Sequence, residues 1–103
     1  MNNIEIIVQE KEKYIFSTYN RKMDVAYLTY CVMFSICDKN KKSLDVHHIV
    51  PRTCGGRNDE ENLIAITKNH HTKLHNLILK SDLSDEERKN LEYAYLKRRG
   101  KIK

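Results

Sequence analysis

All five histidines of this 103-residue sequence lie between positions 47 and 75. His71 and His75 are four residues apart, so on a helix their side chains project from one face, one turn apart. Two imidazoles at this spacing can bind one metal ion, although a packed or solvated pair is equally consistent with the spacing alone. A third ligand must come from another element, and His47 is the candidate. Asp45 lies two residues earlier on the same strand face, where it either hydrogen-bonds the second nitrogen of His47 or faces solvent.

The elements predicted around these histidines are two strands followed by a helix. Short β-forming runs predict strands over residues 44–48 and 63–66. A polar connection that contains glycine, residues 49–62, joins the strands. Thr67 is the predicted N-cap of a helix that ends near residue 80. The order strand, loop, strand and helix therefore occupies the middle of the chain.

Further elements are predicted on both sides of this unit. The sequence IEIIV at residues 4–8 is rich in β-forming residues and predicts a short strand. Apolar residues at helical spacing predict a helix from Asn20, as its N-cap, to Ile36. This helix is apolar on its other sides too, so we expect it to be well buried or to contact a second chain. The sequence S-x-x-E at residues 84–87 is a capping box and predicts a last helix that ends near Gly100.

The composition indicates one small domain with a basic surface. Lys and Arg number 19 against 14 Asp and Glu, a formal net charge of +5, and five of the last seven residues are basic. This balance suits a polyanionic partner, although a solvated basic surface is at least as common. Three cysteines without a C-x-x-C pair favour a reducing cytoplasm. The apolar runs are shorter than a bilayer requires, which predicts a chain that is neither exported nor membrane-spanning.

Residues 44–75, LDVHHIVPRTCGGRNDEENLIAITKNHHTKLH, resemble the HNH nucleases, whose site is the ββα-metal fold. The resemblance consists of the V-H-H-I-x-P start, the glycine pair Gly55-Gly56, the pair Asn62-Leu63 and the H-x-x-x-H sequence at the family's spacings. It covers about a third of the chain, and a small free-standing protein of this kind resembles the nucleases of phages or mobile elements. A single α+β domain over residues 1–103 is implied, with flanking N-terminal and C-terminal helices. Its expected parts are a packing segment (1–43), the ββα-metal core (44–80) and a C-terminal helix with a basic tail (81–103).

The resemblance also implies a role for each residue that matches the family's motif. His47, His71 and His75 match the metal ligands, and the cofactor is one divalent ion, with Mg²⁺, Mn²⁺, Ni²⁺ and Zn²⁺ all open. His48 matches the general base that activates water. Asn62 matches the asparagine that holds the loop and so orients the base. Since neighbouring side chains of a regular strand point to opposite faces, the chain should leave strand geometry at the pair His47–His48.

The function implied is a metal-dependent DNA endonuclease that hydrolyses phosphodiester bonds by nicking or by double-strand cleavage. Four cations near the motif are candidate contacts for DNA phosphates: Arg52, Arg57, Lys68 and Lys73. The main alternative is a non-catalytic nucleic-acid-binding module with a structural metal, which would have no need of a base beside the ligands. A third possibility is a small toxin-like nuclease or interaction protein that is held by a partner. A homodimer and a protein partner both stay open. We expect DNA as the partner, in the cytoplasm of a bacterial or phage-infected cell.

The sequence departs from the family at its second metal site. Many HNH proteins bind a structural zinc through two C-x-x-C pairs. Cys37 matches one of these positions, and the others are occupied by Phe34, Thr67 and His70. One Cys and one His do not complete a tetrahedral site. We therefore expect apolar packing of the helix before Cys37 to replace the zinc, and His70 to be a neighbour of the site or a DNA contact instead of a ligand.

Overall fold

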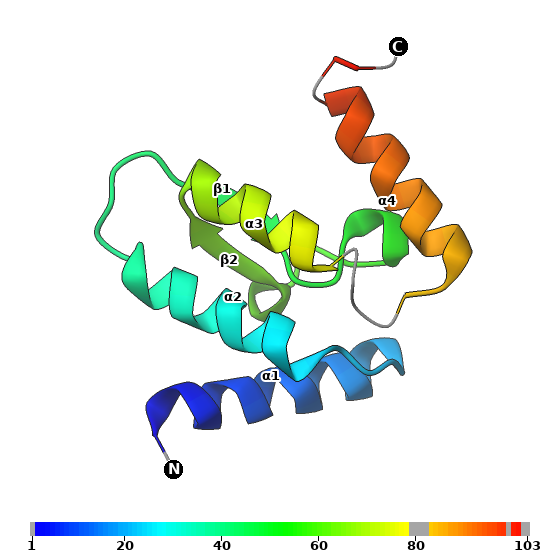
Figure 1. The fold of residues 1–103 in the computed structure, drawn as a ribbon. Coiled ribbons are helices and arrows are strands. Elements are labelled where there is room, and N and C mark those ends of the chain that lie inside the picture. Colours follow the sequence, from blue (N-terminus) through cyan, green and yellow to red (C-terminus); the bar gives the residue numbers. More distant parts are fainter. Residues whose placement is uncertain (1, 79–82, 99, 102–103) are drawn as a thin grey trace.

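The computed structural model describes residues 2–78, 83–98 and 100–101. Within these residues, helices flank a two-stranded sheet (Figure 1). The elements are α1 (Asn3–Tyr19), α2 (Val25–Cys37), β1 (Asp45–His48), the short 3₁₀ helices η1 (Arg52–Cys54) and η2 (Glu60–Asn62), β2 (Leu63–Ile66), α3 (Lys68–Ile78) and α4 (Asp85–Arg98). The predicted end of the third helix near residue 80 and the basic residues Arg99 and Lys103 lie outside the described residues.

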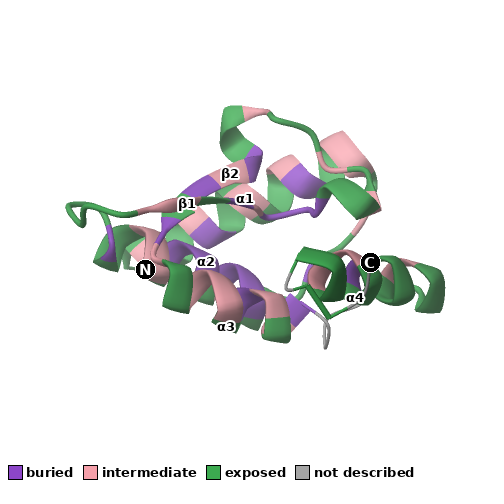
Figure 2. Cartoon of the chain, turned by 90° about the horizontal axis from the view of Figure 1, so that it is seen from above, coloured by how far each residue is buried: buried purple, intermediate pink, exposed green. Residues whose placement is uncertain are grey.

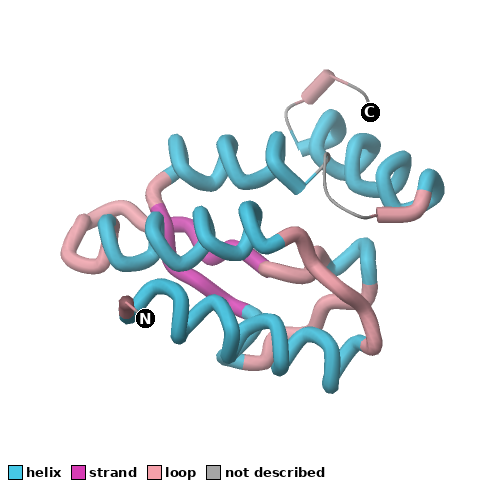
Figure 3. Tube along the Cα trace, turned by 60° about the horizontal axis from the view of Figure 1, so that its bottom comes forward, coloured by secondary structure: helices cyan, strands magenta, loops and turns pink. Residues whose placement is uncertain are grey.

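β1, β2 and α3 form the unit that the sequence predicts. The strands pair antiparallel and lie side by side (Figure 3). The predicted strand over residues 63–66 coincides with β2, and that over residues 44–48 exceeds β1 by one residue. Thr67 precedes α3, and its Oγ1 accepts a hydrogen bond from the His70 N–H at 3.4 Å. α2 contacts α1 on one side and β2 and α3 on the other.

The predicted strand over residues 4–8 is wrong, because these residues lie in α1. Asn2 caps this helix, and its side-chain oxygen accepts a hydrogen bond from the Glu5 N–H at 2.8 Å. Val8 and Ile15 are seven residues apart, on one helical face, and are buried where α1 packs on α2. This packing outweighs the strand preference of the isoleucines, since most helix stability in proteins comes from burial of an apolar face.

Asn20 ends α1 and does not begin α2, which corrects the predicted start of the second helix. Its backbone is left-handed, with φ 50°, a conformation that asparagine tolerates at the end of a helix. Its N–H donates to the Phe16 carbonyl at 2.9 Å. The N-cap of α2 is Asp24, whose carboxylate accepts hydrogen bonds from the N–H groups of Ala26 and Tyr27. Two polar residues suited to a helix end lie four positions apart here, and they serve different helices.

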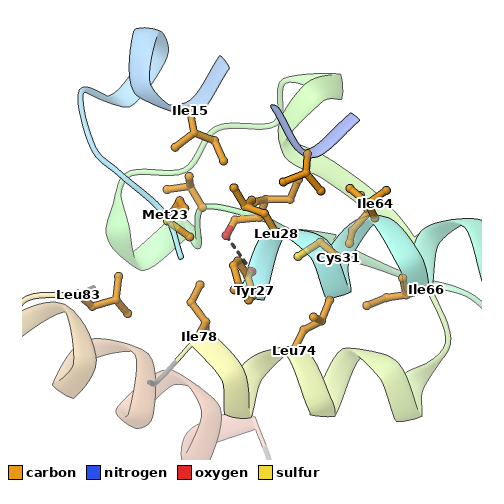
Figure 4. Close-up of a cluster of buried hydrophobic side chains, with 14 of the residues drawn as sticks. Ile15, Met23, Tyr27, Leu28, Cys31, Ile64, Ile66, Leu74, Ile78 and Leu83 are labelled. Carbon is orange, nitrogen blue, oxygen red and sulfur yellow. Dashed lines mark hydrogen bonds between the residues drawn. The ribbon is translucent and has the colours of Figure 1, made fainter. Parts of the chain in front are cut away.

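The centre of the hydrophobic core lies between α2 and α3. Tyr27, Leu28 and Cys31 are buried on the inner face of α2, and Leu74 and Ile78 face them from α3 (Figure 4). The outer face of α2 exposes large apolar side chains: Val25, Tyr30, Met33 and Ile36. α2 is thus covered by α1, β2 and α3, and it keeps one apolar face exposed. In the described residues, no helix combines the length and the apolar character needed to cross a membrane.

α4 is fixed at its N-terminal half, and its surface is largely exposed (Figure 2). The predicted capping box is present: the Ser84 N–H donates to Glu87 Oε1 at 3.1 Å, and the Glu87 N–H donates to Ser84 Oγ at 3.2 Å. Arg21 forms an ion pair with Glu87 at 2.8 Å, and its hydrogen bond lowers the pKa of Glu87 to about 2. Leu91 is buried in the middle of the helix. α4 therefore lies against η1.

A buried carboxylate joins the end of α2 to the start of α3. Asp38 Oδ2 accepts hydrogen bonds from the Thr67 N–H at 2.8 Å and from His70 Nδ1 at 2.7 Å, and Asp38 Oδ1 lies 3.2 Å from Lys41 Nζ. The His70 ring stacks on Phe34, with centroids 4.0 Å apart. Phe34, Thr67 and His70 stand where the family places zinc-binding cysteines. Polar contacts to Asp38 thus join these elements, in addition to the apolar packing that the sequence predicts.

Candidate metal centre

Three imidazoles meet beside the sheet. His47 lies on β1, where it pairs with Ile64 of β2, and His71 and His75 project from one face of α3. Their candidate ligand nitrogens all lie within 4.8 Å of one another. Within the described parts of the chain, this is the only such convergence of His, Cys, Asp or Glu side chains. The fold therefore brings together the three residues that the sequence predicts as ligands.

The spacing of these nitrogens fits a single ion. His71 Nε2 and His75 Nε2 are 3.1 Å apart. Two imidazole nitrogens that bind one ion at about 2.0–2.1 Å in a tetrahedral arrangement lie about 3.3 Å from each other. Imidazole suits divalent transition metals, and a site with three protein ligands leaves a position for water or substrate oxygen.

Burial keeps two of the three imidazoles neutral. His47 is 2% exposed, and burial, followed by the charges of His75 and His71, holds its pKa well below the usual 6.5. Burial, followed by the charges of His71 and Arg98, lowers the pKa of His75 to about 4. A neutral imidazole offers the lone pair that a metal ion requires. At neutral pH these two side chains are therefore ready to bind a cation.

Each of two candidate ligands has a hydrogen-bonding partner at its second nitrogen. Asp45 Oδ2 lies 3.2 Å from His71 Nδ1, so its partner is His71, which is neither of the two alternatives left open by the sequence. The partner of His47 is Tyr27, whose hydroxyl oxygen lies 2.7 Å from His47 Nε2. His75 differs, because its Nδ1 is buried without a partner among the described residues. Such contacts orient metal ligands and set which nitrogen is free.

His48 lies next to the three imidazoles and outside their group. β1 continues through His48, and the bend follows at Ile49–Val50, later than predicted. His47 and His48 nevertheless line one cleft. His48 Nε2 lies 2.8 Å from Asn58 Oδ1, and an amide oxygen only accepts, so the ring nitrogen donates. The other nitrogen, Nδ1, then carries the lone pair of the neutral ring.

Asn62 is fully buried and holds the loop that follows His48. Its Oδ1 accepts a hydrogen bond from the Val50 N–H at 2.8 Å, and its Nδ2 donates to the Val50 carbonyl at 3.2 Å and the Arg57 carbonyl at 2.9 Å. These bonds fix both ends of the glycine-containing loop. Asn62 thus affects the position of His48 through the backbone of the loop. Asn58, which the sequence analysis did not single out, contacts the His48 ring directly.

The two glycines of this loop are required for different structural reasons. Gly55 adopts the left-handed conformation with φ 88°. Gly56 lies so close to the preceding turn that a Cβ atom there would be 1.7 Å from the Val50 carbonyl oxygen. A side chain at position 56 would therefore force apart the loop that Asn62 closes.

The metal cleft is the hollow lined by the four histidines 47, 48, 71 and 75 and by α4. Arg52 of η1 and Arg98 near the end of α4 also line it. Lys68 lines an adjoining groove that shares His71, His75 and Arg98 with the cleft. The Tyr95 ring lies 5.7 Å from that of His75. Cations from three separate elements thus surround the candidate metal centre.

Two of the four predicted phosphate contacts lie elsewhere. Arg57 forms an ion pair with Asp59 at 2.9 Å and lies over the Tyr19 ring at 5.5 Å. Lys73 is exposed on α3 and does not line the cleft. The sequence therefore placed Arg52 and Lys68 near the site, and it missed Arg98, whose basic neighbours suggested only a charged tail.

Residues 31–77 match the sequence model of the HNH endonucleases. The match begins within α2 and includes β1, β2 and nearly all of α3. These residues therefore form an HNH endonuclease domain, and the α+β core with flanking helices is the fold that the resemblance implied. No curated protein and no solved structure matches the chain.

Proposed function

We propose that this protein is a metal-dependent DNA endonuclease. The observation that carries the proposal is the convergence of His47, His71 and His75 beside His48 in one cleft. A phosphodiester is anionic and its alkoxide is a poor leaving group, so hydrolysis needs positive charge at the phosphate and a base for the attacking water. The cleft combines three candidate ligands for a cation with His48, the candidate base.

The protein's own residues are assigned to binding, proton transfer and positioning. A divalent ion held by His47, His71 and His75 would supply charge for the phosphate oxygen and the departing alkoxide. His48 accepts a proton from water at Nδ1 while Asn58 holds its Nε2–H. The water oxygen bonds to phosphorus, the P–O3′ bond breaks, and the departing O3′ takes a proton from solvent water. The products carry 5′-phosphate and 3′-hydroxyl ends, as expected from the resemblance to HNH nucleases.

A supercoiled-plasmid assay across Mg²⁺, Mn²⁺, Ni²⁺ and Zn²⁺, with and without chelator, tests the proposal. Conversion to open-circular or linear DNA that requires one of these ions would support it. Binding of metal and DNA without cleavage under any of these ions would favour the non-catalytic binding module.

His75→Ala should weaken metal binding by at least about 10-fold, because it removes one of three ligands. Isothermal titration calorimetry with Zn²⁺ measures this directly, and cleavage should fall in parallel. Asn76→Ala is the matched control, since Asn76 lies next along α3 and is exposed. An unchanged affinity in His75→Ala would contradict the ligand assignment.

Arg98→Gln should weaken DNA binding uniformly across sequences and reduce the salt dependence of log K by about 1, as expected for one lost phosphate contact. The reason is its position at the cleft, beside Arg52 and Lys68. Fluorescence anisotropy over a salt series measures both quantities. Lys73→Gln makes the same charge change outside the cleft, so an equal effect in that variant would assign the affinity to net charge alone.

A further inference from the structure

Tyr27 connects the hydrophobic core to the candidate metal centre. It lies on α2 and is 2% exposed. Its hydroxyl oxygen is 2.7 Å from His47 Nε2 and 2.9 Å from the Ile49 carbonyl oxygen. The two rings meet at an angle of 70°, with centroids 6.2 Å apart. Tyr27 is thus the buried partner of one candidate ligand.

The two hydrogen bonds determine where the protons lie. A phenol has one proton, and a carbonyl oxygen only accepts, so the Tyr27 hydroxyl donates to Ile49. The bond to His47 must then run the other way, with Nε2–H as donor and the phenol oxygen as acceptor. A neutral imidazole carries one N–H. His47 is therefore protonated at Nε2, and its lone pair lies at Nδ1.

We propose that Tyr27 is a positioning residue that fixes the tautomer of His47 and leaves Nδ1 free to bind the metal ion. The inference rests on the proposed metal centre. It distinguishes His47 from His71, whose Nδ1 faces Asp45 and whose Nε2 faces His75. The two ligands thus bind through different ring nitrogens, each set by a separate partner.

The contact also holds the ring in place. Tyr27 is packed among core residues of α2 and α3, including Leu28 and Leu74, so its hydroxyl has a fixed position. Without this oxygen, the Nε2–H of His47 would have no acceptor in a buried site, and the other tautomer would compete. Loss of a hydrogen-bonding partner of this kind lowers metal affinity by about 10–100-fold.

Tyr27→Phe tests the inference because it removes only the hydroxyl. Calorimetry with Zn²⁺ should show about 10–100-fold weaker binding. Nitrogen-15 NMR of the metal-free proteins should show His47 protonated at Nε2 in the wild type and a mixture of tautomers in the variant. Ile78→Val is the matched control, since it removes one methyl group from the same core as Tyr27 and costs stability there.

The outcomes separate this inference from the proposed function. Failure of the wild type to bind any divalent ion would contradict the metal centre, and so this inference with it, whatever the tautomer. Zn²⁺ binding by the wild type, together with an unchanged affinity in Tyr27→Phe, would overturn the inference and leave the metal centre standing. An equal loss of affinity in Ile78→Val would also overturn it, because general destabilisation would then explain the effect.

Discussion

His48→Ala should reduce phosphodiester cleavage by about 10²–10⁴-fold, the usual contribution of a general base, and should leave metal affinity within about 2-fold of the wild type. The reason is the division of the site: His47, His71 and His75 converge, whereas His48 hydrogen-bonds Asn58 outside that group. Single-turnover cleavage of plasmid DNA and calorimetry with the activating ion measure the two quantities separately.

Two controls distinguish the loss of a general base from the loss of a metal ligand. His75→Ala should lose metal binding and cleavage together, so it provides the reference for the loss of a metal ligand. Added imidazole should restore part of the activity of His48→Ala, since this side chain is only partly buried in an open cleft, and it should not restore His75→Ala. A loss of metal affinity in His48→Ala as large as that in His75→Ala would contradict the assignment of His48 as base.

Asp38→Ala should lower the free energy of unfolding by about 2–3 kcal/mol, because it leaves buried donors unsatisfied. The Thr67 N–H at the start of α3 and the ring nitrogen of His70 both lose their acceptor. Urea denaturation at neutral pH measures the change. Lys41→Gln is the control: Lys41 is largely exposed, so loss of its ion pair should cost less than about 1 kcal/mol. Equal effects in the two variants would contradict the central position of Asp38.

The same carboxylate makes a defined contribution to acid stability. Burial alone would raise the pKa of Asp38, but hydrogen bonds from Thr67 and His70 outweigh it and hold the pKa well below its ordinary 3.8. A depressed folded pKa stabilises the native state above the unfolded pKa, and this contribution disappears as the pH falls through the folded value. The wild type should therefore lose more stability below pH 3.8 than Asp38→Ala does.

Local signals explain the predictions that the structure confirms. The two strands and α3 are separated by a glycine-containing loop and by Thr67, and the last helix begins at a capping box, so each boundary has its own residue signature. The predictions at residues 4–8 and at Asn20 are wrong because, at each position, one residue type suits two structures. Isoleucine fits a strand or a packed helix, and asparagine suits the start or the end of a helix.

The contacts between distant segments could not be predicted from residue spacing. Tyr27 precedes His47 by 20 residues, and its helical spacing indicated only a core position. Asp38 and His70 are 32 residues apart, and no pattern connects them. Asn58 has no counterpart in the motif that identified His48. Arg98 reaches the cleft because α4 is fixed by Arg21 and Glu87, a contact that exists only in the folded chain.

The contacts of Asp38 bear on the order in which the protein is assembled. In small zinc-stabilised domains the metal must arrive before the chain can fold, so metal supply and folding yield are linked. In this protein, hydrogen bonds from Thr67 and His70 to Asp38 join α2 to α3. These contacts need no metal ion. Under the proposed function, metal supply would then control cleavage, and the contacts of Asp38 would hold α2 against α3 without it.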